Sequence, residues 1–439
     1  MFKKFLNYAI PSIIGMLITS LYLVIDGVFV SKGVGEIGVA AVTLVFPLTT
    51  GFTSLSMIFA VGGANLVSIN FGKNNIKKGN DIFRQSIYSL LFIGTILCLL
   101  GVVFSNGIVN ALGATPDLKK PALEYYTYYI LFSIPILLSM TLSTFIRNDG
   151  SPKLSMYSMI LGAITNIILD YVFVFPLGMG LKGAAIATGL GQLVSVLICL
   201  LHFTKKSAKL SFGTVKFRFN DLKDIFVIGL PSFLVEICYS IIMYFYNLTI
   251  IKYIGDVGVT AYGVVNYITN LSYMALFGVS QAIQPLISYH YGSGEFEKCK
   301  GYFKLGSIFS LVISIILFVF YLPFGRNVIS IFSNTKEVMD LSYTILTYTN
   351  LAYIPLGLNM IIITFYQSIC LPKYSNIFCF LRGFLLIKLF LMILPPILGE
   401  GGIWISMLFS EGGTYLISIF ILKKKLKESL SVSTPNISS

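Results

Sequence analysis

The sequence predicts an all-α membrane protein in which twelve transmembrane helices form two pseudo-symmetric lobes of six. Composition gives the first indication, because 56% of the 439 residues are hydrophobic and only 11% are charged, whereas soluble domains carry about 25% charged residues. The second is a series of about twelve apolar runs, each long enough to cross a bilayer as a helix. The third is that the second half of the chain repeats the first in one register. Together these features exclude a single soluble core.

The expected spans are apolar runs bounded by polar or Gly/Pro-rich connections. In the first lobe they cover 8–30, 38–70, 85–108, 122–146, 154–175 and 183–203, and in the second 225–251, 258–290, 302–322, 341–370, 375–398 and 402–422. We therefore expect a first lobe over 1–203, a cytoplasmic linker over 204–224, a second lobe over 225–422 and a cytoplasmic tail over 423–439.

Lysine and arginine account for the net charge of +13, and they cluster in alternate connections between the spans. This alternation is the positive-inside pattern, which places both termini and the basic loops in the cytoplasm. No basic stripe with interleaved aromatic residues lies outside the spans, so a nucleic-acid partner is not expected. Short loops favour a multi-pass protein of a bacterial inner membrane.

The repeat is ungapped, with a constant shift of 220 positions. It pairs Pro11 with Pro231, Lys32 with Lys252, Ser68 with Ser288, Pro135 with Pro355, and Pro176 with Pro396. Six spans per repeat insert both halves in the same orientation, a geometry that transporters use to enclose a cavity at the membrane midplane. The alternative is a duplication that serves stability alone.

Three polar residues interrupt the apolar runs of the first lobe only: Asp26, Asn166 and Asp170. Their repeat counterparts are Tyr246, Leu386 and Phe390. Asn166 and Asp170 are four residues apart and share one helix face. Buried together, two carboxylates and an amide need a bound cation or a shared proton, and oxygen ligands suit Na⁺. Alternatively, the two acids are helix-end groups that face water on the outer side.

At these residues the sequence resembles the multidrug and toxic compound extrusion (MATE) transporters, bacterial type, over essentially its whole length. Both halves carry the PS opening and a G-x-x-G-V-x-A connection. In archaeal and many bacterial members, a cation site comprises an Asp on span 1, N-x-x-x-D on span 5 and a Thr on span 6. The matching residues here are Asp26, Asn166, Asp170 and Thr188, and Pro11 matches a proline at which span 1 bends.

The resemblance implies a secondary active antiporter that exports organic, cationic or amphipathic compounds in exchange for Na⁺ or H⁺, with no other cofactor. A lipid-linked or oligosaccharide flippase of the same superfamily is the alternative, and it would need a strongly cationic cavity. A sensor or scaffold would need an additional soluble domain. No enzymatic or nucleotide-binding motif occurs, so we expect a small organic substrate and transport driven by an ion gradient. A monomer is expected.

The second lobe departs from one branch of the family, which carries a Glu eight residues after the span 7 proline. That position is Tyr239 here, and Glu236 lies three residues earlier on roughly the same face. Glu236 either substitutes for that Glu or pairs with Arg382 or Lys388, and Glu411 is similarly open. Span 7 and its neighbour are rich in tyrosine, including Tyr239 and Tyr246. Their rings would attract organic cations or serve only for packing. The expected substrate-binding residues are therefore Tyr239, Tyr246, Glu236 and Arg382.

Overall fold

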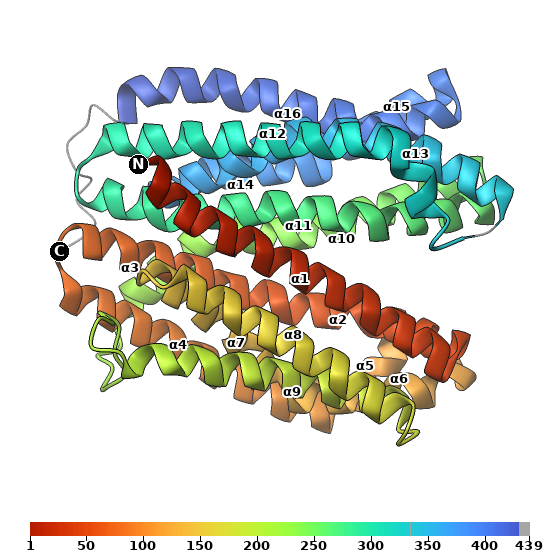
Figure 1. Ribbon diagram of the computed structural model, residues 1–439, viewed down its shortest axis with the longest axis horizontal. Helices are drawn as coiled ribbons and strands as arrows, with labels where there is room; N and C mark the ends of the chain where they lie inside the picture. The colour runs from red at the N-terminus through yellow and green to blue at the C-terminus, as the bar shows by residue number, and fades with distance from the viewer. Residues whose placement is uncertain (334, 430–439) are drawn as a thin grey trace. The chain divides into compact units, whose positions relative to one another are not determined.

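The computed structural model describes residues 1–333 and 335–429, and within these ranges all regular elements are helices (Figure 1). Ten of the described helices are long and apolar enough to cross a membrane, or eleven when one bent pair is taken as a single span. The expected span over 258–290 forms a 37-residue helix that is not among them, since Asn, Ser and Gln side chains interrupt its apolar run. The all-helical fold class is confirmed.

The first half of the chain begins with α1, which contains Pro11 and remains helical from Phe2 to Val34. The elements that follow are α2 (Glu36–Met57), the π-helical turn η1 (Ile58–Gly62), α3 (Gly63–Gly72), α4 (Ile76–Val103), α5 (Ser105–Ala111), α6 (Pro116–Leu131), α7 (Ser133–Asn148), α8 (Pro152–Val174), α9 (Gly180–Leu200) and the 3₁₀ turn η2 (Leu201–Thr204). Within this half α8 packs along α9, α7 packs on α9, and α2 packs on α6.

The expected span over 122–146 is bent by 53° between α6 and α7. Pro135 explains the position of this bend, because it has no N–H to donate to the carbonyl of Leu131, the last residue of α6. At the bend, Phe132 packs where Gly189 of α9 has no side chain: a Cβ on Gly189 would lie 2.0 Å from the ring. A proline and an aromatic residue fitted to a glycine together account for the break.

The second half contains longer, less interrupted helices. They are α10 (Phe219–Tyr253), α11 (Asp256–Gly292), α12 (Phe296–Ile329), α13 (Lys336–Ser368), α14 (Pro372–Phe380), the π-helical turn η3 (Leu381–Leu385), α15 (Leu386–Leu398) and α16 (Glu400–Ser429). Within this half α11, α12 and α13 pack against one another, and α16 packs on α13 and α15 (Figure 1). The expected tail begins inside α16, and its last part, 430–439, lies outside the described residues.

Packing divides the chain into two units whose boundaries differ from the expected ones. One unit is Ile10–Phe233, and the other combines Met1–Ala9 with the chain from Leu234 onward. In the second unit the Phe5 ring meets Phe309 edge-on at 4.9 Å, and Lys4 lies over the Tyr289 ring. The linker over 204–224 and the part of α10 up to Phe233 therefore belong, by packing, to the first unit.

Side-chain hydrogen bonds attach the linker to one end of the first unit. Asn80 of α4 donates to the carbonyl of Lys209 at 2.8 Å and accepts from the amide of Ser211 at 2.7 Å. The Asp149 carboxylate, after α7, accepts from His202 Nε2 at 2.7 Å and from two linker amides at 3.0 and 3.1 Å. Lys78 pairs with Asp221 at 2.6 Å. These contacts make the linker an ordered part of that unit.

The start of α10 is also in direct backbone contact with η1. A Cβ added to Gly229 would lie 2.1 Å from the carbonyl oxygen of Ile58, and one added to Gly62 would lie 2.1 Å from that of Ile225. Ile58 and Gly62 are the first and last residues of η1. Small residues let two helix backbones approach this closely inside a membrane.

We expect Gly229→Ala to lower the free energy of unfolding by about 1–3 kcal/mol, because the new methyl group overpacks this backbone contact. The measurement is thermal unfolding of the purified protein in detergent. The matched control is Gly263→Ala on α11, where an added Cβ meets no atom within 4 Å. The control is expected to be neutral or slightly stabilising, since alanine favours helix. Equal unfolding temperatures for the two variants would contradict the close contact.

Candidate functional site

Two carboxyl groups face each other in the first lobe, Asp26 from α1 and Asp170 from α8. They are close enough to share a hydrogen bond once one of them carries a proton. Asp170 is fully buried and Asp26 is partly buried. Among the described residues, neither oxygen of Asp170 nor Oδ1 of Asp26 has a hydrogen-bond donor. Two ionised acceptors in contact would repel each other, so this pair requires a proton or a cation between its oxygens.

Asn166 and Thr188 complete the cluster from neighbouring helices. Asn166 lies one turn before Asp170 on α8, and its Nδ2 donates to Thr188 Oγ1 of α9 at 3.4 Å. Glycines make this helix contact possible, because a Cβ on Gly191 would lie 2.8 Å from the carbonyl oxygen of Gly162 and 2.9 Å from Asn166 Cβ. The structure therefore brings together all four residues named as cation ligands. Their role in cation binding stays a prediction.

The ligand chemistry of the cluster fits a hard monovalent cation or a proton. Asn166 Oδ1 also lacks a donor among the described residues, which gives four buried oxygens without donors in one cluster. The described residues contain no group of three His, Cys, Asp or Glu side chains placed to hold a metal ion. Oxygen-only ligands suit Na⁺, whereas transition metals prefer sites with nitrogen or sulfur.

A shell of neutral side chains that was not predicted from the sequence surrounds the acidic pair. Tyr22 of α1 lies close enough to both acids to feel their charges, and Gln192 of α9 lies beside it. Tyr125 of α6 also interacts with both acids, and its ring stacks on Tyr129 at 6.0 Å. One signal was available for Tyr22, because it lies four residues before Asp26 and so shares its helix face. The other contacts join distant segments and carry no signature in the sequence.

The second lobe contains a buried ion pair that the sequence analysis did not assign. Arg382, in η3, contacts Glu411 Oε1 of α16 through Nη2 at 2.7 Å and through Nε at 2.9 Å. Asn359 of α13 donates to the other carboxylate oxygen at 2.8 Å. Both charged residues are over nine-tenths buried. Full pairing and hydrogen bonding make this burial tolerable.

The Arg382–Glu411 ion pair rules out one alternative for Glu236, which was a salt bridge to Arg382. Lys388, the other expected partner, lies over the rings of Phe245 and Phe384 at 5.7 and 5.8 Å. No ion pair joins Glu236 to any described residue, and burial is the main influence on its carboxyl group. Glu236 is thus a half-buried acid without a cationic partner in the described part of the chain.

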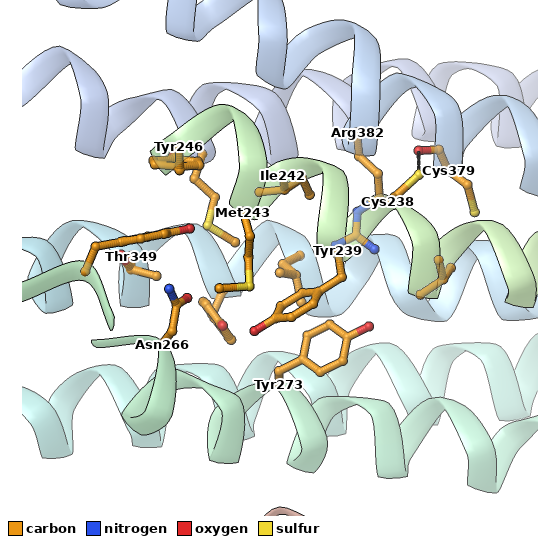
Figure 2. A pocket seen from close by; sticks show the side chains of 15 residues that line it. Cys238, Tyr239, Ile242, Met243, Tyr246, Asn266, Tyr273, Thr349, Cys379 and Arg382 are labelled. Carbon is orange, nitrogen blue, oxygen red and sulfur yellow. Dashed lines mark hydrogen bonds between the residues drawn. The ribbon is translucent and has the colours of Figure 1, made fainter. Parts of the chain in front are cut away.

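A small cavity lies between α10, α11, α13 and η3 in the second lobe (Figure 2). Of the four residues expected to bind substrate, Tyr239, Tyr246 and Arg382 line it, and Glu236 does not. Figure 2 shows Tyr239 beside Tyr273, with ring centroids 5.7 Å apart. The cavity volume of about 40 Å³ holds a few water molecules. Drug-sized ligands occupy about 300–1,000 Å³, so this conformation would have to open to admit one.

A family model described as MatE matches residues 11–172 and matches again over 231–391. The chain belongs to the MatE family. The two matches begin at Pro11 and Pro231, the residues that open the two halves of the repeat. MatE proteins are membrane transporters, so this multi-pass chain is a transporter and not an enzyme.

Bacterial relatives of this MatE chain carry the name multidrug export protein MepA. The protein from Staphylococcus haemolyticus is 24% identical over 423 residues, covering 96% of this chain and 93% of the relative. The protein from Staphylococcus aureus strain MRSA252 is 24% identical over 438 residues, covering 99% and 96%. These relatives match the chain over nearly its full length.

Solved structures agree with the fold of this MatE chain. One, described as the outward-facing conformation of a multidrug resistance MATE family transporter, superposes with a TM-score of 0.93 at 23% identity, over 98% of this chain and 97% of that chain. A transporter of the MOP superfamily from Pyrococcus furiosus gives 0.92 at 24% identity over the same shares. At this level of identity the likeness shows the fold alone.

We expect Arg382→Met and Glu411→Leu, made singly, to lower the free energy of unfolding by about 3–5 kcal/mol, because each leaves the other charge buried and unpaired. The double variant is expected to recover most of this loss. Glu236→Gln is the control, and its neutral side chain costs no ion pair. Thermal unfolding of the four variants in detergent forms a double-mutant cycle with one control. Additive losses in the double variant would show that the two residues are not coupled.

Proposed function

We propose that this MatE chain is a secondary active antiporter that exports organic cations or amphipathic compounds as Na⁺ or H⁺ enters the cell. The observation that carries the proposal is the buried pair Asp26–Asp170, whose oxygens lack donors among the described residues. Burying two unpaired acids among membrane-spanning helices is energetically costly. Ionisable residues in such positions mark functional sites. The names of the staphylococcal relatives, which are multidrug export proteins, support the direction and the breadth of transport.

In this mechanism the coupling cation and the substrate favour different conformations of the transporter. A cation from outside binds between the two carboxylates and neutralises their repulsion, which lowers the cost of keeping α1 and α8 together around them. Binding shifts a conformational equilibrium only through a difference in affinity between the two states. Coupling therefore requires that the acidic pair hold the cation more tightly in one state than in the other. We place both termini in the cytoplasm and propose that the protein acts as a monomer.

Pro11 would serve as the hinge of α1. A proline inside a helix removes one backbone hydrogen bond and weakens resistance to bending. The boundary between the two packed units also falls next to it, between Ala9 and Ile10. A bend at Pro11 would let the part of α1 that carries Asp26 move without detaching Met1–Ala9 from the second unit.

The lining of the second-lobe cavity favours organic cations over lipid-linked phosphates. A flippase would need unpaired basic groups in its cavity, but Glu411 neutralises Arg382 here. The remaining lining is largely aromatic and apolar, including Tyr239 and Tyr273. Aromatic faces attract cations by about 0.5–2 kcal/mol each. A lining that has no unpaired basic group and is rich in aromatic rings is therefore suited to an organic cation.

Asp26→Asn and Asp170→Asn, made singly, are expected to abolish gradient-driven export of a fluorescent organic cation from proteoliposomes. Each variant replaces one carboxylate by an amide, so the pair loses one of the two negative charges that hold the coupling ion. Na⁺ and pH gradients are imposed separately, so that the response of the wild-type protein identifies the ion. The control is Asp117→Asn, an exposed acid at the start of α6. Full activity of both site variants would rule out the coupling role.

Tyr239→Leu is expected to raise the KM for the organic cation about 2- to 30-fold while leaving the KM for an uncharged substrate nearly unchanged. The reason is that the ring contributes about 0.5–2 kcal/mol of cation–π attraction, and a tenfold change corresponds to 1.4 kcal/mol. Initial rates of export against substrate concentration provide the measurement. Tyr244→Leu, at a tyrosine that is 61% exposed, is the matched control. Equal shifts for charged and uncharged substrates would indicate a packing role only.

A further inference from the structure

Lys388 places a positive charge in the interior of a candidate membrane span. It lies on the span Pro372–Leu398, ten residues before the end. A helix rises about 1.5 Å per residue, so Lys388 is about 15 Å from that end, or about half the ~30 Å thickness of the hydrocarbon core. Lysines near helix ends extend their ammonium groups to the interface, but Lys388 is too deep for that. Among the described residues, no carboxylate forms an ion pair with it.

Two aromatic rings position the ammonium group of Lys388. Its Nζ lies over the ring of Phe245 of α10 at 5.7 Å and over the ring of Phe384 of η3 at 5.8 Å. The two rings lie against each other with centroids 5.9 Å apart. An aromatic face attracts a cation through its quadrupole but carries no opposite charge. The described residues therefore hold the charge of Lys388 in place without neutralising it.

This pair of rings lies between Lys388 and residues that line the second-lobe cavity. Phe245 directly precedes Tyr246, and both Tyr246 and Arg382 line the cavity. Phe384 lies two residues after Arg382 in the same π-helical turn. Burial decreases in the same order, because Tyr246 and Arg382 are buried, the two phenylalanines are partly buried and Lys388 is exposed. A molecule that approaches from the exposed side would meet the lysine first.

The surface around Lys388 is otherwise apolar. Leu385, Leu389 and Met392 share one face of the span and are 47%, 44% and 66% exposed, and Lys388 lies beside them. An apolar surface with a single cation complements a molecule that has an apolar body and one acidic group. A molecule of that kind is an amphipathic compound that carries a carboxylate.

The repeat shows that the fold does not require this cation or its two rings. The positions 220 residues before Phe245, Phe384 and Lys388 hold Ile25, Ile164 and Ile168. All three are isoleucine in the first lobe, where the span remains an uninterrupted α-helix. The lysine and both rings thus occur together in the lobe that contains the aromatic cavity. A buried structural role would be served by the isoleucines.

We propose that Lys388 binds the acidic group of amphipathic substrates, so that the transporter also exports zwitterionic compounds that carry a carboxylate. The proposal rests on the proposed antiport function, whose substrate class it extends from cations to zwitterions. The carboxylate neutralises a charge that has no anionic partner among the described residues, and the apolar body of the compound packs on the exposed leucines. The aromatic rings then separate the bound molecule from the cavity.

The test compares two substrates in proteoliposomes of phosphatidylcholine: a rhodamine dye with a free carboxylate and the methyl ester of the same dye, which is a cation only. Lys388→Met is expected to raise the KM for the carboxylate dye about tenfold or more, because an ion-paired hydrogen bond is lost. The KM for the methyl ester should not change. Lys388→Arg keeps the charge and should retain most of the preference. Lys388→Ile introduces the residue of the first lobe and should repeat the result of Lys388→Met.

The matched control is Lys252→Met. Lys252 is also exposed and lies over an aromatic ring, that of Tyr253 at 5.5 Å, but at the end of its helix. This variant should leave the KM of both dyes unchanged. Equal KM shifts for the two dyes in Lys388→Met, or no shift for either, would overturn the proposal. Loss of activity toward both dyes only in vesicles that contain phosphatidylglycerol would also overturn it, since Lys388 would then hold an anionic lipid.

The methyl ester separates this proposal from the antiport function. If neither a Na⁺ nor a pH gradient drives export of the ester by the wild-type protein, the antiport function itself fails. If the ester is exported but the carboxylate dye is not, only the extension to zwitterions fails.

Discussion

The energetic cost of burying charge among membrane-spanning helices governs how the two lobes differ. In the second lobe, Arg382 and Glu411 meet at 2.7 Å, and Asn359 satisfies the remaining carboxylate oxygen. Opposite charges and complete hydrogen bonding offset the cost of burial there. In the first lobe, Asp26 and Asp170 carry charges of the same sign, and the described residues supply no cationic partner to either. The negative charge of that site is neutralised only when it binds a proton or a cation from outside the protein.

The repeat places these two arrangements of buried charge in equivalent helices of the two lobes. Arg382 and Glu411 are the counterparts of Gly162 and Gly191, which touch across α8 and α9 in the first lobe. Two glycines bring those helices into backbone contact and set Asn166 against α9. At the same positions in the second lobe, an ion pair joins η3 to α16, and Arg382 lies within a π-helical turn. Duplicated helices have therefore diverged into a fixed ion pair in one lobe and an adjustable acidic pair in the other.

Much of the fold could be predicted, because apolar runs and an ungapped repeat are properties of the sequence alone. The bend at Phe132 could not be predicted from Pro135 alone. Its counterpart Pro355 lies inside the continuous helix α13, so a proline within a span does not by itself determine whether the helix bends. The attachment of the linker was missed for a different reason. Hydrogen bonds such as those of Asn80 and Asp149 join neutral or common surface residues across more than 50 positions, and no periodicity reports them.

The candidate site was predictable to the extent that charge is rare inside membrane spans. Asp26 and Asp170 stand out from their apolar surroundings, and the four-residue spacing of Asn166 and Asp170 fixes a shared face. Tyr125 and Gln192 do not stand out, because tyrosine and neutral polar side chains are common in these helices. The choice of Glu411 over Glu236 as the partner of Arg382 was equally hidden. It depends on which face of α16 packs against η3, and that information exists only in the folded chain.

Helix α1 connects the acidic pair to the rest of the molecule. Asp26 and Tyr22 lie on its portion within the unit Ile10–Phe233, whereas Met1–Ala9 packs in the other unit through Phe5 and Phe309. Under the proposed function, neutralising Asp26 changes the force on one part of a helix whose other part is anchored elsewhere. The strain of that change would fall at the weakest point between them, and Pro11, with its missing hydrogen bond, is the residue least able to resist it. Under that function, a single helix carries a change of charge at one site to residues that pack in the other unit.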